Sequence, residues 1–216
     1  ADEVLKRAKQ KVSPAVRAST PDNGAACANW GMRMMFAADM HRSFSDFYAD
    51  RHGVRTRYLQ LMSRLAHHFR GHRGVIGFDP LNEPWGEEVR ELSPLYHDVA
   101  RVVRAELPDA ILFLEGHVLT NGGFLGSALP KPTFDNYAYA PHYYDAGVLL
   151  GHSYSGISTG ADIAFALMTQ KAQALGAPLL LGEYGAPAGT HRADDYLTLL
   201  HRHLNRALAS GTQWNY

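Results

Sequence analysis

Apolar side chains follow a helical rhythm from residue 54 onward, and each helical stretch is followed by a short apolar run. From Val54 to Phe69 the apolar positions recur at intervals of three and four, which predicts a helix. The residues after it, 75–78, predict a short strand. The same pattern predicts further helices at 93–106, 161–175 and 194–210, and further strands at 110–115, 137–142 and 178–183.

Residues that favour helix ends and turns punctuate this pattern. Ser93 and Pro94 supply the N-cap and first turn expected of a helix start. Gly176 marks the end of the helix at 161–175, and Gly211 marks the end of the last helix. The chain therefore reads as helices and strands in strict alternation.

Polar or aromatic residues that follow the strands are spaced as in a series of βα repeats. Glu83, Glu115, His142, Glu183 and Trp214 are 27 to 41 residues apart, which matches βα repeats of about 30 residues or more. Alternation of this kind predicts the α/β class and a (β/α)8 TIM barrel. Five strands are visible in the sequence, whereas a full barrel typically takes about 250 residues.

The expected organisation is a single catalytic barrel domain over residues 1–216. Within it, residues 54–216 carry the βα repeats. Residues 1–53 mix a short basic start, a loop-like stretch and an aromatic and Met-rich patch, which indicates an irregular excursion.

The amino-acid composition argues against a nucleic-acid partner and a membrane span, but it does not identify a binding partner. The 21 basic and 21 acidic residues cancel, so no strong field attracts a polyanion and we expect no nucleic-acid partner. No stretch approaches the roughly 20 apolar residues of a membrane span. Cys27 is the single cysteine, which excludes an internal disulfide. A removed signal peptide would leave no trace, so a secreted or extracytoplasmic location stays open, as does the oligomeric state.

Two glutamates stand where an apolar strand gives way to a loop. Glu83 lies in the run GFDPLNEPW at 77–85, and Glu183 lies in LLLGEYG at 179–185. In a parallel barrel, catalytic residues gather at these carboxyl ends of strands. Breaking a glycosidic bond requires one carboxylic acid to protonate the leaving oxygen and one carboxylate to meet the sugar carbon. The pair therefore predicts a glycosidase.

Other chemistries find little support in the sequence. Twelve histidines are present, but no His-Glu-x-x-His run or cysteine pair supplies metal-ligand spacing, so no metal site is predicted. The run GHSYSG at 151–156 lacks the flanking glycines of a nucleophile elbow. No phosphate-cradling glycine loop is present either, and no cofactor is expected.

Several of these runs together resemble glycoside hydrolase family 5, a family of retaining β-glycosidases, and within it the endoglycoceramidase-like branch. The resemblance covers roughly residues 54–216 and rests on VIGFDPLNEPW at 75–85, PHYY at 141–144, GEYG at 182–185 and a late tryptophan. It implies that the visible strands are the fourth to the eighth of the barrel and that the first three are missing from the sequence as given.

The resemblance also implies roles for six residues. Glu83 would be the acid/base and Glu183 the nucleophile, with Asn82 bound to the sugar 2-hydroxyl. The other three would orient the nucleophile or contact the sugar: His142, Tyr144 and Trp214.

Two alternatives stay open at this point. The family's early-strand arginine and third-strand histidine have no counterpart here, so an inactive barrel fragment or pseudoenzyme that only binds carbohydrate is the second hypothesis. The substrate is equally open between a glycolipid, as in endoglycoceramidases, and a β-glucan, as in endoglucanases.

Overall fold

The computed structural model describes residues 36–214, and the chain divides into two compact units, residues 1–43 and 44–216. Of the first unit, residues 36–43 are described, and they contain the start of helix α5, Ala38–Tyr48. This helix lies in the stretch where an irregular excursion was expected. The methionines at 32, 34 and 35 of that excursion lie outside the described residues.

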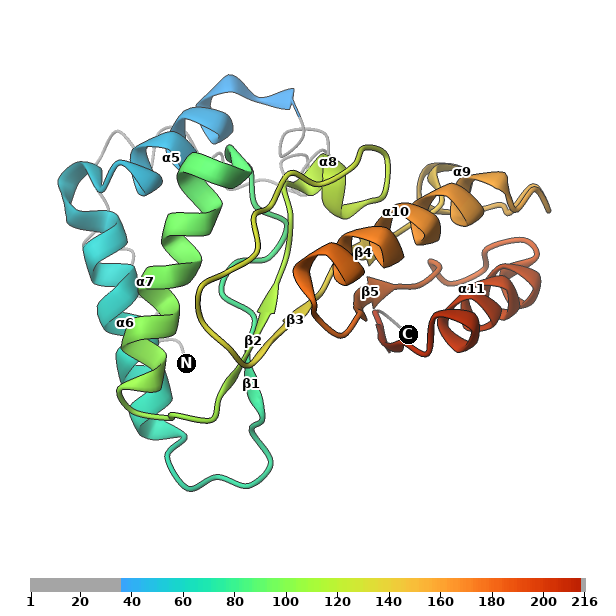
Figure 1. The fold of residues 1–216 in the computed structure, drawn as a ribbon. Helices are drawn as coiled ribbons and strands as arrows, with labels where there is room; N and C mark the ends of the chain where they lie inside the picture. The colour runs from blue at the N-terminus through green and yellow to red at the C-terminus, as the bar shows by residue number, and fades with distance from the viewer. Residues whose placement is uncertain (1–35, 215–216) are drawn as a thin grey trace. The chain divides into compact units, whose positions relative to one another are not determined.

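Helices and strands alternate through the second unit, as βα repeats require (Figure 1). Its helices are η1 (Arg51–Gly53), α6 (Val54–His68), η2 (Glu88–Leu92), α7 (Ser93–Arg104), α8 (Val118–Asn121), α9 (Ala146–Gly151), α10 (Thr159–Leu175) and α11 (Ala193–Ala207). Its strands are β1 (Gly77–Phe78), β2 (Ile111–Leu114), β3 (Tyr137–Tyr139), β4 (His142–Tyr143), β5 (Leu180–Tyr184) and β6 (Ser210–Gln213). Within residues 36–214, no helix combines the length and apolar character that crossing a membrane requires.

The strands form two parallel ladders, ordered β1-β2-β3 and β4-β5-β6. β3 and β4 are parts of one extended segment, interrupted where Pro141 lacks the N–H that a ladder needs. Hydrogen bonds continue across the break: Ala140 N–H donates to Leu114 O over 2.8 Å, and Gly182 N–H donates to Pro141 O over 2.8 Å. The five predicted strands therefore lie in chain order in one parallel series.

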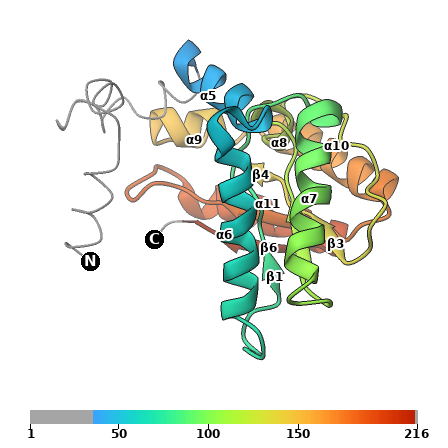
Figure 2. The same ribbon diagram turned by 90° about the vertical axis from the view of Figure 1, so that its left-hand side faces the viewer.

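One hydrophobic cluster packs helices α6 and α7 against β2. Figures 1 and 2 both show the two helices side by side. Tyr96 and Val99 of α7 and Leu112 and Leu114 of β2 are almost fully buried in it. Alternate residues of β2 thus point into this cluster, as the period of two along a strand requires.

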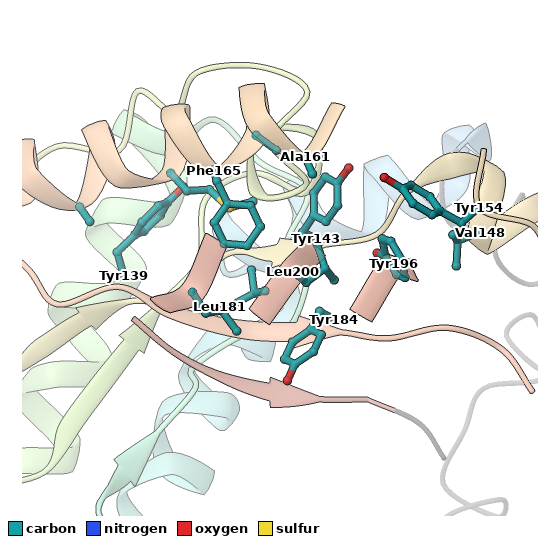
Figure 3. Packing of buried hydrophobic residues seen from close by; sticks show 14 of the residues in the cluster. Tyr139, Tyr143, Val148, Tyr154, Ala161, Phe165, Leu181, Tyr184, Tyr196 and Leu200 are labelled. Atoms are coloured by element: carbon teal, nitrogen blue, oxygen red, sulfur yellow. The ribbon is translucent and has the colours of Figure 1, made fainter. Parts of the chain in front are cut away.

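A second hydrophobic cluster packs helices α10 and α11 against the other ladder. Figure 3 shows Phe165 of α10 and Leu200 of α11 converging with Tyr143 of β4 and Leu181 of β5. Leu181 is fully buried. Since Glu183 lies two residues farther along β5, the cluster anchors the strand that carries one of the predicted catalytic residues.

Most predicted elements are confirmed, but two helix boundaries were wrong. Ser93 is not an N-cap, because the helical turn η2 precedes α7 and is itself capped by Glu87, whose side chain accepts from Val89 N–H and Arg90 N–H. The last helix ends at Ala207 rather than at Gly211, and Gly211 lies within β6. Glycine is a common helix terminator, but here a leucine takes that position.

Leu208 terminates α11 in the left-handed conformation, with φ 50°, and its side chain is 95% exposed. This backbone region costs a residue with a Cβ about 1 kcal/mol, whereas glycine enters it freely. We therefore expect Leu208→Gly to stabilise the chain by about 0.5–1 kcal/mol in urea unfolding. Leu208→Ala keeps the Cβ and serves as the control; equal stability of the two variants would contradict the prediction.

Candidate active site

The candidate site lies at the carboxyl ends of the parallel strands, where the side chains of neighbouring strands meet. Glu83 and Glu115 follow β1 and β2, His142 opens β4, and Glu183 lies near the end of β5. The register of the β4–β5 ladder pairs His142 directly with Glu183. Four strands, β1, β2, β4 and β5, therefore deliver charged side chains to one place.

Glu83 lies on a backbone turn of unusual conformation. Its φ is 45°, in the left-handed region that residues other than glycine rarely adopt. Its N–H donates to the Oε2 atom of Glu115 over 3.0 Å. Strained backbone of this kind persists only where the surroundings hold it, and the Glu115 carboxylate is a charged acceptor at that point.

His142 lies among three carboxylates and is only 3% exposed. Its Nδ1 atom is 3.0 Å from Oε1 of Glu83 and 3.6 Å from Oε2 of Glu183, and its Nε2 atom is 3.3 Å from Oε1 of Glu115. A neutral imidazole has one N–H, whereas an imidazolium donates from both nitrogens. Carboxylates on both sides therefore select the cation.

The pKa of His142 follows from two opposing effects. Burial lowers the pKa, but the ion pair with Glu115, the hydrogen bond to Glu83 and the negative charge of Glu183 outweigh burial and raise the pKa to about 10. The ring is therefore an imidazolium at neutral pH.

Glu183 is held from the opposite side by Tyr144. The Tyr144 hydroxyl donates to Oε2 of Glu183 over 2.9 Å. Burial raises the pKa of Glu183, while the His142 cation and the Tyr144 hydrogen bond oppose that rise. Burial and the Glu183 charge raise the pKa of Tyr144, so its hydroxyl keeps its proton and remains a donor.

Gly182 provides the space in which the imidazole lies. A Cβ atom at this position would lie 2.9 Å from Ala140 O and 3.1 Å from two ring atoms of His142. Any larger residue before Glu183 would push against the ring. Close packing against His142 therefore explains why the residue before Glu183 in the GEYG run is a glycine.

The carboxylates of Glu83 and Glu183 face one another at short range. One oxygen of each, together with a nitrogen of His142, lies within 4.8 Å of the others. Glu83 and Glu183 are 100 residues apart in the sequence, and the ends of β1 and β5 bring their carboxylates together. The imidazolium lies beside both.

Behind this pair lies a second carboxyl pair, Asp79 and Glu115. Glu115 is fully buried, and its Oε2 also accepts a hydrogen bond from the side-chain amide of Asn121. Asp79 is exposed as a residue, but its carboxyl lies against Glu115: an oxygen of each and a His142 nitrogen lie within 4.8 Å of one another. Desolvation of the Asp79 carboxyl, then the charge of Glu115 and a hydrogen bond to it, raise the Asp79 pKa to about 8.

The two remaining predicted residues, Asn82 and Trp214, lie at the margin of the candidate site. Asn82 is exposed, and within the described part of the chain its side chain makes no hydrogen bond. Trp214 follows β6, is 57% exposed, and lines a cavity of about 290 Å³ together with Tyr144. The other residues lining this cavity are Leu149, Gly185, Ala186, Pro187 and Ala188.

Two groups of side chains have the spacing of metal ligands, and both include His142. They are Asp79, Glu115 and His142, and Glu83, His142 and Glu183. A histidine binds a metal only through a deprotonated nitrogen. Because both ring nitrogens of His142 face carboxylates and its pKa is about 10, this arrangement fits an ion-paired imidazolium better than a metal ligand.

Four of the six predicted site residues therefore come together: Glu83, Glu183, His142 and Tyr144. The sequence did not reveal Asp79 as part of the site and gave Glu115 no role. A signal was available, because both are acidic residues at the end of an apolar strand.

A parallel βα series with two glutamates facing each other at its strand ends defines a glycoside hydrolase of the barrel class. The model of the family Cellulase (glycosyl hydrolase family 5) matches residues 24–216. The chain belongs to glycosyl hydrolase family 5, and the predicted resemblance is confirmed.

Solved structures show the same fold. Endo-glycoceramidase II from Rhodococcus sp., in complex with ganglioside GM3, has a TM-score of 0.74 at 21% identity, covering 81% of this chain and 44% of that chain. An endogalactoceramidase has a TM-score of 0.66 at 26% identity, covering 82% of this chain and 40% of that chain. The prediction of a (β/α)8 barrel fold is therefore confirmed, and the chain spans less than half the length of both neighbours.

A relative by sequence is a Beta-xylosidase from Phanerodontia chrysosporium. It is 30% identical over 105 residues, which cover 48% of this chain and 20% of that protein. The names of all these proteins denote glycosidases, which agrees with the class that the fold and site define.

The raised pKa of His142 predicts how stability depends on pH. The folded state binds this proton more tightly than the unfolded state, whose pKa is about 6.5. The stabilising contribution is therefore complete below about pH 6.5 and is lost as pH rises through about 10. Asp79, whose pKa is also raised, acts in the same direction. We expect the free energy of unfolding in urea to fall between about pH 6.5 and 9.5.

His142→Gln is the control for this measurement. It removes the titrating ring, so its stability should be lower at pH 6.5 and should decline less with rising pH. A wild-type stability that stays constant or increases over this range would contradict the assignment of the proton to His142.

Proposed function

We propose that this chain forms part of the catalytic barrel domain of a retaining β-glycoside hydrolase, with Glu83 as acid/base and Glu183 as nucleophile. The observation that supports this most is the separation of their carboxylate oxygens, which is no more than 4.8 Å. Retaining enzymes hold the two carboxyls about 5–5.5 Å apart, whereas inverting enzymes leave about 6.5–9.5 Å for a water. The short gap favours direct attack by Glu183.

In the first step, protonated Glu83 gives its proton to the glycosidic oxygen while Glu183 attacks the anomeric carbon. The bond between that carbon and the leaving oxygen breaks, and a glycosyl ester to Glu183 forms. In the second step, Glu83 takes a proton from water, whose oxygen attacks the same carbon and breaks the ester. The sugar leaves with its β configuration retained, and both glutamates return to their starting protonation states.

Tyr144 and His142 prepare Glu183 for attack. The Tyr144 hydroxyl holds Oε2 of Glu183 and so fixes the direction of the carboxylate. The His142 cation lies 3.6 Å from that oxygen and stabilises the negative charge that burial disfavours. Both contacts oppose the rise in pKa that desolvation causes in this half-buried carboxylate, and so favour the ionised form that attacks.

Trp214 and Asn82 are proposed as sugar-binding residues. Trp214 lines the cavity beside Tyr144, so a sugar ring lying on the indole would have its anomeric carbon near Glu183. Asn82 directly precedes Glu83, and its exposed amide is available to a sugar hydroxyl. The apolar lining of the cavity suits the apolar face of a pyranose ring.

For the substrate, we propose a glycolipid with a β-linked sugar head group. Two of the structural neighbours are an endo-glycoceramidase and an endogalactoceramidase. The cavity wall contains Leu149, next to the 76% exposed Leu150. A β-glucan is the second candidate, because the family model that the chain matches is that of cellulases.

Substitution of the two glutamates by alanine separates their roles. Glu83→Ala should reduce turnover of substrates with poor leaving groups by about 10²–10⁴-fold, because those groups need a proton. A dinitrophenyl β-cellobioside needs none, so its first step should survive and azide should replace water to give the β-glycosyl azide. Glu183→Ala should lose both steps and, with azide, give the α-glycosyl azide.

The control is Glu106→Ala, which removes a carboxylate that pairs with His67 and Arg70 beyond the end of α7. It should leave turnover unchanged. An α-azide from Glu83→Ala, or near-normal turnover by either catalytic variant, would contradict the assigned mechanism.

Replacement of Trp214 tests the sugar platform. Trp214→Ala should raise KM about tenfold, which corresponds to about 1.4 kcal/mol of lost stacking, and should leave kcat within a few-fold. Trp214→Phe keeps a ring and should recover part of the affinity. A variant that lowers kcat while KM stays constant would show that the indole does not act by binding the ground-state sugar.

A further inference from the structure

Glu115 is the most thoroughly buried charged group of the described residues, and the two-glutamate mechanism gives it no task. Its side chain is fully buried at the end of β2. One oxygen accepts from Glu83 N–H and from the Asn121 amide, and the other lies 3.3 Å from Nε2 of His142. A buried carboxylate is costly unless its partners repay the desolvation, and here two of the partners belong to the proposed active site.

We propose that Glu115 is a positioning residue: one carboxylate oxygen holds the backbone turn that aims Glu83, and the other holds the His142 imidazolium beside both catalytic glutamates. Asp79, on the far side of Glu115, completes this device by sharing a proton with it. The effect on catalysis rests on the proposed function, whereas the effect on His142 does not.

The backbone turn at Glu83 depends on the carboxylate of Glu115. Glu83 keeps a φ of 45° although it has a Cβ atom. Its N–H donates to the charged Oε2 atom of Glu115 over 3.0 Å. Hydrogen bonds to charged acceptors are among the stronger ones in proteins. Loss of this acceptor would release the turn and let the Glu83 side chain leave its place opposite Glu183.

The charge on His142 depends on the carboxyls around its ring. Its ion-paired partners are Glu83 from the loop after β1, Glu115 from the end of β2 and Glu183 from β5. Asp79 also has an oxygen within 4.8 Å of a ring nitrogen. Of the three ion-paired carboxylates, Glu115 is the one at Nε2. If it became neutral, Nε2 would lose its anionic partner and the ring would more readily give up a proton. A neutral ring would no longer stabilise Glu183 by charge.

A proton on Asp79 would reduce the negative charge around the His142 cation. Four carboxyls surround a single imidazolium: Asp79, Glu83, Glu115 and Glu183. An oxygen of Asp79 lies within 4.8 Å of one of Glu115, and desolvation and the Glu115 charge raise the pKa of Asp79 to about 8. The proposal therefore places a proton between these two carboxyls at neutral pH. The Asp79–Glu115 pair then carries one negative charge, which the His142 cation balances.

Glu88 offers a matched control, because it is a second buried glutamate and it accepts hydrogen bonds from the loop that follows β2. Its Oε1 atom accepts from His117 N–H over 2.8 Å and from the Thr120 hydroxyl over 2.6 Å. It is 5% exposed, and no contact joins it to His142 among the ion pairs of the described residues. Glu88→Gln therefore disturbs the loop that follows β2 without removing a charge that faces the imidazole.

The test is an NMR titration of the chain labelled with ¹⁵N-histidine. The His142 signal is assigned by its loss in His142→Gln. In the wild type, the ring should stay protonated through neutral pH. In Glu115→Gln, the pH at which the ring titrates should fall by at least one unit. Glu88→Gln should leave the titration in place. Asp79→Asn mimics the protonated acid and should also leave it nearly unchanged.

Three outcomes would contradict the proposal. The titration of His142 would be the same in Glu115→Gln as in the wild type, or Glu88→Gln would move it equally, which would assign the effect to the loop. A large shift in Asp79→Asn would show that the proton is not on Asp79. Thermal unfolding monitored by circular dichroism confirms that each variant compared is folded, and Asp79→Asn, at an exposed position, remains measurable where Glu115→Gln unfolds.

Kinetics with the dinitrophenyl and an unactivated β-glycoside give the catalytic part of the test. Glu115→Gln should lower kcat by about 100-fold on the unactivated substrate, as misplacement of a catalytic group does, and should shift the pH profile of kcat. An unchanged pH profile would contradict the catalytic role. If the wild type hydrolyses neither substrate, the proposed function fails, while the His142 titration still decides the role of Glu115.

Discussion

The buried imidazolium of His142 is the interaction on which the rest of the site depends. Carboxylates from three strand ends lie within 3.0 to 3.6 Å of its two nitrogens. Without a cation between them, such carboxylates would repel one another and would each take up a proton or turn away toward water. The one positive charge therefore favours the ionised form of Glu183 although other carboxyls lie close by.

The fold supplies this cation at the correct place through backbone pairing. The ladder of β4 and β5 sets His142 opposite Glu183, and the absence of an N–H at Pro141 ends the preceding ladder just before the histidine. Two hydrophobic clusters hold the sheet in place. One packs α6 and α7 against the first ladder, and the other packs α10 and α11 against the second. Apolar packing thus fixes strand positions, and the strands in turn fix a charge arrangement that electrostatics alone would not assemble.

The sequence predicted what local patterns encode and missed what tertiary contacts decide. Apolar periodicity located the main helices and strands, and strand-end position singled out Glu83 and Glu183. The left-handed turn at Glu83 depends on an acceptor 32 residues away, so no local signal announces it. Leu208 ends α11 although leucine favours helix. The role of Glu115 requires knowing that its neighbours are His142 and Glu83, which the order of residues does not reveal.

The site has two parts, the wall of the cavity beside Tyr144 and the cluster of charged groups, and the two differ in how freely their residues can be replaced. Its wall is built from loop residues at 185–188, from Leu149 and from Trp214, whereas the charged groups are anchored on strands and bonded to one another. Tyr144 belongs to both parts, since it lines the cavity and donates to Glu183. Evolution, or an engineer, has room to remodel the loops for a different sugar or aglycone and leave the reaction intact, provided that this tyrosine is kept.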